Sequence, residues 1–179
     1  MQSFYQLRKA NIKDVQKIEE IAKKAIYQKE DKKRNTNGFL IPYSIEEYKN
    51  FIEKADHFLL VLVKNNVVGF LLAHSSQYNF GGEIYDEILQ NEKNNFMVVR
   101  QICIEDQYHK LGLGKELYRY LEKKAKEQKI EKMFCFIWED PICNKPSQTF
   151  HKKMGWKKQK SYQLKNKTKI AGIWMKKII

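Results

Sequence analysis

The segment from Ile102 to Lys115 constrains the fold of this chain more than any other. It reads Ile-Cys-Ile-Glu-Asp-Gln-Tyr-His-Lys-Leu-Gly-Leu-Gly-Lys, which is an apolar strand end, a polar turn and two glycines that open a helix. The free backbone N–H groups of a helix N-terminus and the positive end of the helix dipole point the same way. Because glycines let an anion approach the backbone closely, the segment predicts a binding site for a pyrophosphate.

Other phosphate-binding motifs fit this segment less well. The Rossmann fingerprint needs a third glycine where Leu117 stands, and a Walker A loop needs Ser or Thr where Glu116 stands. Lys110 and Lys115 add positive charge at the rim of the turn. On their own, the two glycines are equally compatible with a tight turn that binds nothing.

The remaining residues alternate between helical and strand periodicity, without a linker or a repeat. Ser44 with Glu47 has the spacing of a capping box, and Lys64-Asn65-Asn66 separates two β-rich runs as a hairpin turn would. Residues 75–95 and the charged stretch Lys29 to Asn37 are polar and are expected to be loops. The expected helices are Asn11–Ala25, Ser44–Ala55, Gly112–Gln128 and Ser147–Lys153; the expected strands are Phe4–Leu7, His57–Val63, Val67–His74, Phe96–Ile104, Met133–Trp138, Trp156–Leu164 and Lys169–Lys176.

This order of elements predicts an α+β (mixed α/β) fold in one domain, residues 1–179. A chain of 179 residues with 42% hydrophobic residues suits a single core, and no apolar run approaches the ~20 residues of a membrane span. The polar N-terminus, Met1 to Lys9, has no apolar signal sequence. We therefore expect a cytoplasmic protein that does not enter a membrane.

Charge and cysteines narrow the possible ligands. The net charge of +13 comes mostly from lysine and favours polyanionic ligands, among them nucleotide cofactors, nucleic acid and acidic surfaces. Cys103, Cys135 and Cys143 form no C-x-x-C pair, and the four histidines are scattered. We expect no metal site, and we expect Cys103 and Cys135 to be small buried hydrophobic residues.

Two motifs resemble those of a known family. The segment Ile102–Lys115 resembles motif A of the GNAT superfamily of N-acyltransferases, where a hydrophobic strand precedes Gln/Arg-x-x-Gly-x-Gly/Ala; His109 departs from it at the Gln/Arg position. The run Asn144-x-x-Ser147-x-x-Phe150-His151-x-x-x-Gly155-Trp156 resembles the family's later motif, Asn-x-x-Ala-x-x-Phe/Leu-Tyr-x-x-x-Gly-Phe. Arg8-x-Ala10 before a helix resembles the usual opening. The likeness spans nearly the whole chain and is most specific over residues 102–156.

The resemblance implies a GNAT-like fold, with a mostly antiparallel central sheet of about six to seven strands flanked by about four helices. It implies an N-acetyltransferase that moves an acetyl group from acetyl-CoA to a primary amine of a small molecule, peptide or protein, as a monomer or homodimer. Ile102, Cys103 and Ile104 would expose backbone groups to the pantetheine arm. The other implied coenzyme A-binding residues are Lys110, Leu111, Gly112, Leu113, Gly114, Lys115 and Asn144.

The reaction needs a base for the amine and benefits from an acid for the departing thiolate. His151 stands at the position of the family's tyrosine acid, and an imidazolium could donate a proton there; alternatively, His151 only packs. Glu139 resembles the proposed base of ribosomal-protein N-terminal acetyltransferases by its spacing from Asn144; alternatively, it is only solvated. Other candidate bases are Asp140, Glu83, Asp86 and Glu87.

Aromatic residues have two interpretations each. Trp138, Phe150 and Trp156 are expected to belong to the core, with packing beside the adenine as the alternative. Tyr27, Phe39 and Tyr43 lie where the family builds its acceptor pocket.

Two other functions stay open: a basic nucleic-acid-binding domain, although no Arg-rich or RNP-type motif supports it, and an inactive coenzyme A sensor, since His109 and His151 both depart from the family pattern.

Overall fold

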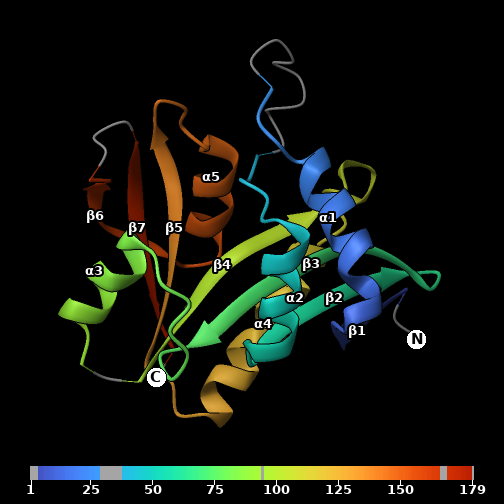
Figure 1. Ribbon diagram of the computed structural model, residues 1–179, viewed down its shortest axis with the longest axis horizontal. Helices are drawn as coiled ribbons and strands as arrows, with labels where there is room; N and C mark the ends of the chain where they lie inside the picture. Colours follow the sequence, from blue (N-terminus) through green and yellow to red (C-terminus); the bar gives the residue numbers. More distant parts are fainter. Residues whose placement is uncertain (1–3, 29–37, 94, 166–168, 179) are drawn as a thin grey trace. The chain divides into compact units, whose positions relative to one another are not determined.

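The computed structural model describes residues 4–28, 38–93, 95–165 and 169–178, so the charged stretch Lys29 to Asn37 lies outside the described residues. Seven strands hydrogen-bond in the order β1-β2-β3-β4-β5-β7-β6, and the α+β class is confirmed (Figure 1). The strands are β1 (Tyr5–Lys9), β2 (His57–Val63), β3 (Asn66–Ser75), β4 (Phe96–Ile104), β5 (Lys132–Asp140), β6 (Lys157–Gln163) and β7 (Ile170–Lys177). The helices are α1 (Val15–Lys24), α2 (Ile45–Lys54), α3 (Glu83–Asn91), α4 (Leu113–Glu127) and α5 (Lys145–Lys153), with 3₁₀ turns η1 (Ile12–Asp14) and η3 (Asp106–Tyr108).

The chain forms two compact units: Met1–Ala73 with Gln101–Leu121, and His74–Arg100 with Glu122–Ile179. In the first unit, β2 pairs antiparallel with both β1 and β3. The turn between β2 and β3 has positive φ at Lys64 (50°) and Asn65 (65°). Two such residues match the right-handed twist of the flanking strands, which confirms the expected hairpin.

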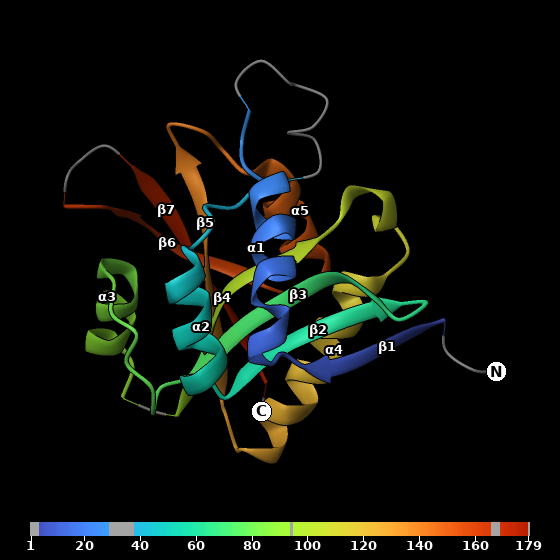
Figure 2. The ribbon, with the colours of Figure 1, turned by 45° about the vertical axis from the view of Figure 1, so that its right-hand side comes forward.

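Capping interactions in the first unit fix the start of α2 and of η1, the 3₁₀ turn that leads into α1. The Ser44 hydroxyl accepts from Glu47 N–H and the Glu47 carboxylate accepts from Ser44 N–H, as the capping box predicts. Asn11 caps η1 in the same reciprocal way with Asp14, whose carboxylate also binds Arg8 through two 2.7 Å contacts. Figure 2 shows α1 and α2 side by side over β2 and β3, and they bury aliphatic and aromatic side chains there.

The end of β4 lies very close to β3 within the first unit. A Cβ added to Gly69 would lie 2.4 Å from Ile104 Cδ1 and 2.6 Å from the Cys103 carbonyl oxygen. Glu105 N–H donates to the Val68 carbonyl at 2.8 Å. Only a glycine allows this approach, so Gly69 sets the position from which the chain enters the glycine turn.

In the second unit, β4 and β5 pair in parallel from Phe96↔Lys132 to Val99↔Cys135, and β7 pairs antiparallel with β5 and β6.

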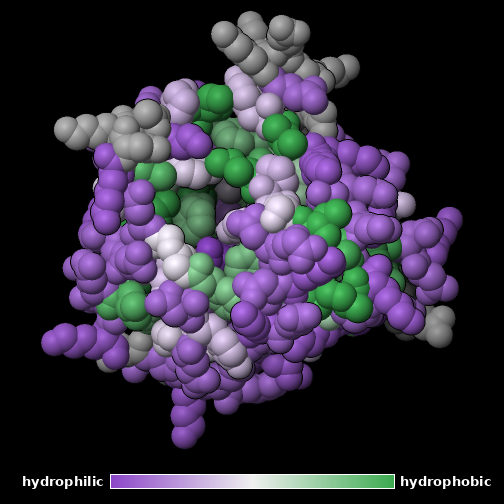
Figure 3. All heavy atoms as spheres, viewed as in Figure 1, coloured by the Kyte–Doolittle hydropathy of each residue, from purple (hydrophilic) through white to green (hydrophobic). Residues whose placement is uncertain are grey.

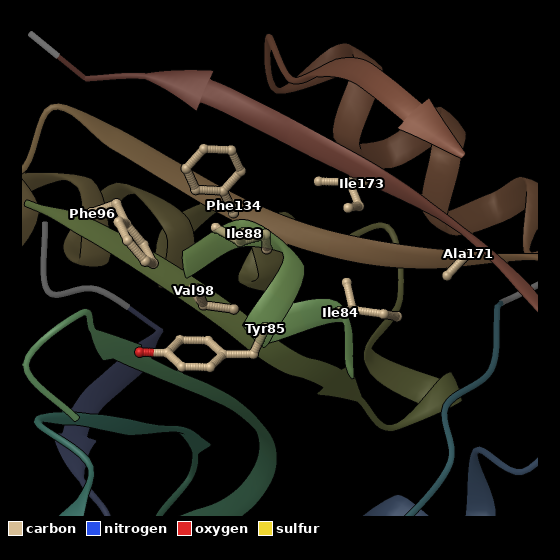
Figure 4. Packing of buried hydrophobic residues seen from close by; sticks show 8 residues of the cluster. All are labelled: Ile84, Tyr85, Ile88, Phe96, Val98, Phe134, Ala171 and Ile173. Carbon is tan, nitrogen blue, oxygen red and sulfur yellow. The ribbon is translucent and has the colours of Figure 1, made fainter. Parts of the chain in front are cut away.

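The expected loop over residues 75–95 is wrong in part, because Glu83–Asn91 is the helix α3. Its inward residues pack on three strands of this unit (Figure 4), in a cluster made of Ile84, Tyr85, Ile88, Phe96, Val98, Phe134, Ala171 and Ile173. The helix was missed because flanking glycines and polar residues mask its short apolar stripe.

Hydrophilic residues cover most of the face shown in Figure 3, as expected for a lysine-rich chain.

Cys103 and Cys135 are free and buried, as expected, whereas Cys143 is exposed. Burial raises the pKa of Cys103 to about 12, so this thiol stays protonated. Among the described helices, none is long and apolar enough to cross a bilayer.

Candidate functional site

The predicted pyrophosphate turn is formed by the exit of β4, η3 and the start of α4, all in the first unit. Lys110 and Gly112 have φ of 63° and 81°, so the backbone turns sharply just before the helix begins. At the start of α4, Glu116 N–H donates to the Gly112 carbonyl at 3.1 Å. The N–H groups that precede Glu116 therefore belong to the first helical turn, where α-helices leave their donors to outside partners.

The accessible side of this turn carries positive charge. Lys110, Leu111, Gly112 and Lys115 are exposed, whereas Leu113 is buried and anchors the first turn of α4. A Cβ placed on Gly112 would have no heavy atom within 4 Å, so space lies directly over this residue. Open space, two lysines and a helix N-terminus are together suited to an anion with several charged oxygens.

His109, which departs from the family pattern, has a structural role in this turn. Its Nε2 lies 2.7 Å from the Ile104 carbonyl oxygen. A carbonyl only accepts, so Nε2 carries the hydrogen and donates it. The imidazole thereby closes the loop from Ile104 to His109.

A buried polar contact ties the middle of β4 to α2 in the first unit. Tyr48 O–H donates to Gln101 Oε1 at 2.9 Å, and Gln101 Nε2 donates to the Ile41 carbonyl at 2.7 Å. Burial raises the pKa of Tyr48 well above its usual value, so the phenol remains a donor. Sequence reasoning missed Gln101, whose only signal was a polar residue inside an apolar strand.

Aromatic rings make further contacts within the first unit. Tyr43 lies against Tyr48 and Phe51, with ring centroids 5.7 and 4.9 Å apart, and Tyr27 meets Phe39 edge to face at 5.3 Å. The three aromatic residues expected at an acceptor pocket thus form two separate pairs or clusters within the first unit. Their role in binding an acceptor stays a prediction.

The second motif forms the start and the body of α5, in the second unit. Asn144 is the N-cap: its Oδ1 accepts from Ser147 N–H at 3.3 Å, and its own N–H donates to the Trp138 carbonyl at 2.9 Å. Asn144 is therefore a link between the end of β5 and α5, and this accounts for an asparagine at the head of the motif. Its contact with coenzyme A stays a prediction.

His151 is buried, with 3% of its surface exposed, between Phe150 and Trp156 at 5.4 and 5.5 Å between ring centroids. Its Nδ1 lies 2.8 Å from the Ser147 carbonyl oxygen, so Nδ1 carries the hydrogen. Burial lowers the pKa of His151 to about 4, and the ring is neutral at pH 7.

Glu139 has two partners on β6, also within the second unit. Its Oε1 lies 2.7 Å from Lys158 Nζ, and its Oε2 accepts from the Ser161 hydroxyl at 2.7 Å. Gly172 makes room for this carboxylate, because a Cβ there would lie 2.6 Å from Glu139 Oε1. Two donors from β6 therefore fix the direction of this carboxylate.

The alternative carboxylates lie on α3 or at the exposed end of β5. Glu83 accepts from Lys165 N–H at 2.7 Å, and Glu87 pairs with Lys160. Asp86 and Asp140 are exposed. Over the ranges that the structure describes, no group of three or more His, Cys, Asp or Glu side chains is arranged to hold a metal ion.

The acetyltransferase (GNAT) family matches residues 15–156, and the chain belongs to this family. Solved structures with the same fold include Ard1 from Thermoplasma volcanium (TM-score 0.74, 13% identity, 99% of each chain covered). Others are Naa50 of Arabidopsis thaliana in complex with the bisubstrate analogue CoA-Ac-MVNAL (TM-score 0.67, 14% identity, covering 97% of this chain and 99% of that one) and the PaiA N-acetyltransferase of Thermoplasma acidophilum in complex with coenzyme A (TM-score 0.67, 18% identity, 97% and 98%). A sequence comparison with curated proteins finds no match.

Proposed function

We propose that this chain is an acetyl-CoA-dependent N-acetyltransferase whose acceptor is a primary amine. The observation that carries the proposal is the turn from Ile104 to Leu113, with positive φ at Lys110 and Gly112 at the head of α4. The family match and the coenzyme in two structural neighbours support the same ligand. The backbone N–H groups from Lys110 to Lys115 hold the pyrophosphate, and Ile102–Ile104 contact the pantetheine arm.

In the proposed reaction, the amine nitrogen attacks the thioester carbonyl carbon, the C–S bond breaks and the thiolate leaves. The amine loses one proton and the thiolate gains one, so the overall reaction is balanced without a metal. Positioning of the amine beside the carbonyl provides much of the acceleration. Glu139 is the proposed base, and its contacts with Lys158 and Ser161 hold the carboxylate in a fixed direction.

The proposed acid role of His151 depends on its protonation. With a pKa of about 4, about one molecule in a thousand holds the imidazolium at pH 7. Proton donation by His151 therefore requires that bound coenzyme raise this pKa, as a nearby thiolate would. Without such a rise, the ring packs α5 against Trp156 and solvent protonates the thiolate.

Thiol release from acetyl-CoA, measured across polyamines, aminoglycosides, amino acids and N-terminal peptides, tests the proposal. Release with at least one amine, together with calorimetric binding of coenzyme A, is the expected result. Coenzyme A binding without release across the panel would identify a sensor instead. Salt-sensitive binding of RNA or DNA with no coenzyme A affinity would identify a nucleic-acid-binding domain.

A further inference from the structure

Charge is distributed unevenly along this chain. Residues 141–179 contain 11 of the 34 basic residues and none of the 21 acidic ones, so they carry most of the net charge of +13. Acidic residues occupy 21 of 179 positions, and an even spread would place about four or five of them in this segment. A lysine-rich composition adds cations everywhere but does not remove the anions from one place. The lack of acidic residues is therefore a local property of this segment.

The helix α5 presents this charge on one side. Its four exposed residues are Lys145, Thr149, Lys152 and Lys153, and its other residues are partly or fully buried. Positions three, four, seven and eight apart lie on the same side of a helix, so the four residues form one stripe opposite the buried His151. This stripe has three ammonium groups, and it has neither a carboxylate nor a large apolar side chain.

The start of β6 continues the stripe within the second unit. Lys152 Nζ lies 5.9 Å from the centroid of the Trp174 ring, and Trp174 pairs with Lys158 in the ladder between β7 and β6. The last turn of α5 therefore lies beside the first residues of β6, where Lys157 is exposed. We call the exposed lysines of this region the basic surface: Lys145, Lys152, Lys153 and Lys157.

Ion pairs neutralise other lysines of the segment but not those of the basic surface. Three lysines pair with carboxylates from outside the segment, Lys158 with Glu139, Lys160 with Glu87 and Lys176 with Glu122. Among the residues that the structure describes, the four lysines of the basic surface form no ion pair with a carboxylate. The contact of Lys152 with an indole ring leaves its charge in place. Four exposed positive charges thus attract an anion from outside the protein.

We propose that the basic surface binds the phosphate backbone of a nucleic acid without reading its bases. A row of ammonium groups can contact several phosphates of one strand, and each contact releases a counterion from the nucleic acid. Phosphate contacts carry no sequence information, so they require no base-reading motif. The proposal goes beyond acetyl transfer, since it uses none of the residues assigned to the coenzyme or to the chemistry.

An anionic membrane fits the basic surface less well. A helix that binds at a membrane surface inserts an apolar face between the lipids. The apolar side of α5 is turned into the fold, and none of the exposed large hydrophobic residues that the structure describes lies in residues 141–178. Charge without an exposed apolar face therefore favours the nucleic acid.

The salt dependence of RNA binding tests the proposal. Fluorescence anisotropy of a labelled oligouridylate of about 20 nucleotides is measured from about 50 to about 200 mM KCl. If each of the four lysines contacts one phosphate, the slope of log K against log salt concentration should be about −3, from about −0.7 per contact. Affinity should then fall about 50-fold over this range. Absence of binding at about 50 mM KCl would overturn the proposal.

Two variants with the same net charge locate the binding surface. The test variant removes the basic surface by Lys145→Gln, Lys152→Gln, Lys153→Gln and Lys157→Gln. The control variant changes four exposed lysines elsewhere, by Lys13→Gln, Lys54→Gln, Lys123→Gln and Lys126→Gln. The test variant should bind at least about 10-fold more weakly at about 50 mM KCl, with a slope between 0 and about −1, whereas the control should keep a slope of about −3. Equal losses in the two variants would mean that only net charge matters, and would overturn the proposal.

A smaller change guards against misfolding of the test variant. Circular dichroism should show that both variants are folded. The double variant Lys145→Gln, Lys153→Gln should lose about half of the slope, and an unchanged slope in it would contradict the proposal.

The remaining measurements separate other ligands. Sedimentation with phosphatidylcholine–phosphatidylserine vesicles should show weaker binding than the RNA at equal phosphate concentration; tighter binding to the vesicles would overturn the proposal in favour of a membrane. Calorimetry with coenzyme A should give the test and control variants the same affinity, within a few-fold. A selective loss in the test variant would assign the basic surface to the coenzyme and overturn the proposal. RNA binding by a protein that does not bind coenzyme A would support this proposal and overturn the proposed function.

Discussion

A negative charge introduced at Gly112 is the sharpest test of the pyrophosphate turn. Asp and Asn have nearly the same shape, and both tolerate positive φ better than other residues with a side chain. An added Cβ meets no heavy atom within 4 Å, and φ is 81°, so Gly112→Asp and Gly112→Asn share the same backbone strain, about 1–2 kcal/mol. The two variants therefore differ only in one negative charge.

The size of the effect follows from Coulomb's law. A carboxylate about 5 Å from one phosphate charge costs about 0.8 kcal/mol at the dielectric constant of water and about 3 kcal/mol at an effective value of about 20. Gly112→Asp should therefore bind coenzyme A about 4- to 160-fold more weakly than Gly112→Asn in calorimetry at low salt. The difference should shrink as ionic strength rises, because mobile ions screen exposed charges.

Acetyl-pantetheine, which lacks the pyrophosphate, is the matched control ligand. Both variants should bind it with equal affinity, and circular dichroism should confirm that both are folded. Equal affinity for coenzyme A at low salt in the two folded variants would refute the assignment of this turn. Gly112→Glu, which places a longer charged side chain at the same point, should lose most of its coenzyme A binding.

Four further predictions concern buried contacts and catalysis. Gly69→Ala should lower the free energy of unfolding by about 1–3 kcal/mol in urea denaturation, because its Cβ would lie 2.6 Å from a backbone oxygen of β4; a change within about 0.5 kcal/mol would contradict the close approach. Tyr48→Phe should cost about 1–3 kcal/mol, since its buried glutamine partner loses a donor, and an unchanged urea midpoint would contradict this. The pKa of His151 falls from 6.5 to about 4 on folding, so the unfolded chain binds more protons between these values and stability is lost as pH falls from about 6.5 to 4. At 1.36 kcal/mol per unit this amounts to about 3 kcal/mol, and His151→Gln should flatten the dependence in denaturation curves; an unchanged slope would place the titration elsewhere. Glu139→Gln should lower kcat by about 100-fold or more with little change in coenzyme A affinity, and a full-rate variant would move the base to another group.

Several local structures of this protein were predictable from its sequence, because they depend on residues close together in the chain. The capping box at Ser44 and the hairpin turn at Lys64-Asn65 depend on residues within three or four positions of one another, and the structure confirms both. The strand-turn-helix segment before α4 is local in the same sense, because positive φ at Gly112 and the helix start are properties of a short stretch of chain. These signals sufficed for the fold class and the family.

Side-chain contacts between distant segments of the chain could not be predicted from the sequence. The sequence did not indicate that Ser161 and Lys158 reach Glu139, that Tyr48 bonds Gln101, or that Arg100 donates to His74, since 19 to 53 positions separate these partners. The protonation of His151 also depends on tertiary structure. A histidine has a reference pKa of about 6.5, and burial in this fold lowers the pKa of His151 to about 4. Short-range patterns in the sequence predicted most of the helices and strands, with α3 as the exception. Which side chains lose water, and which partners replace it, depends on the packing of strands that lie far apart in the chain.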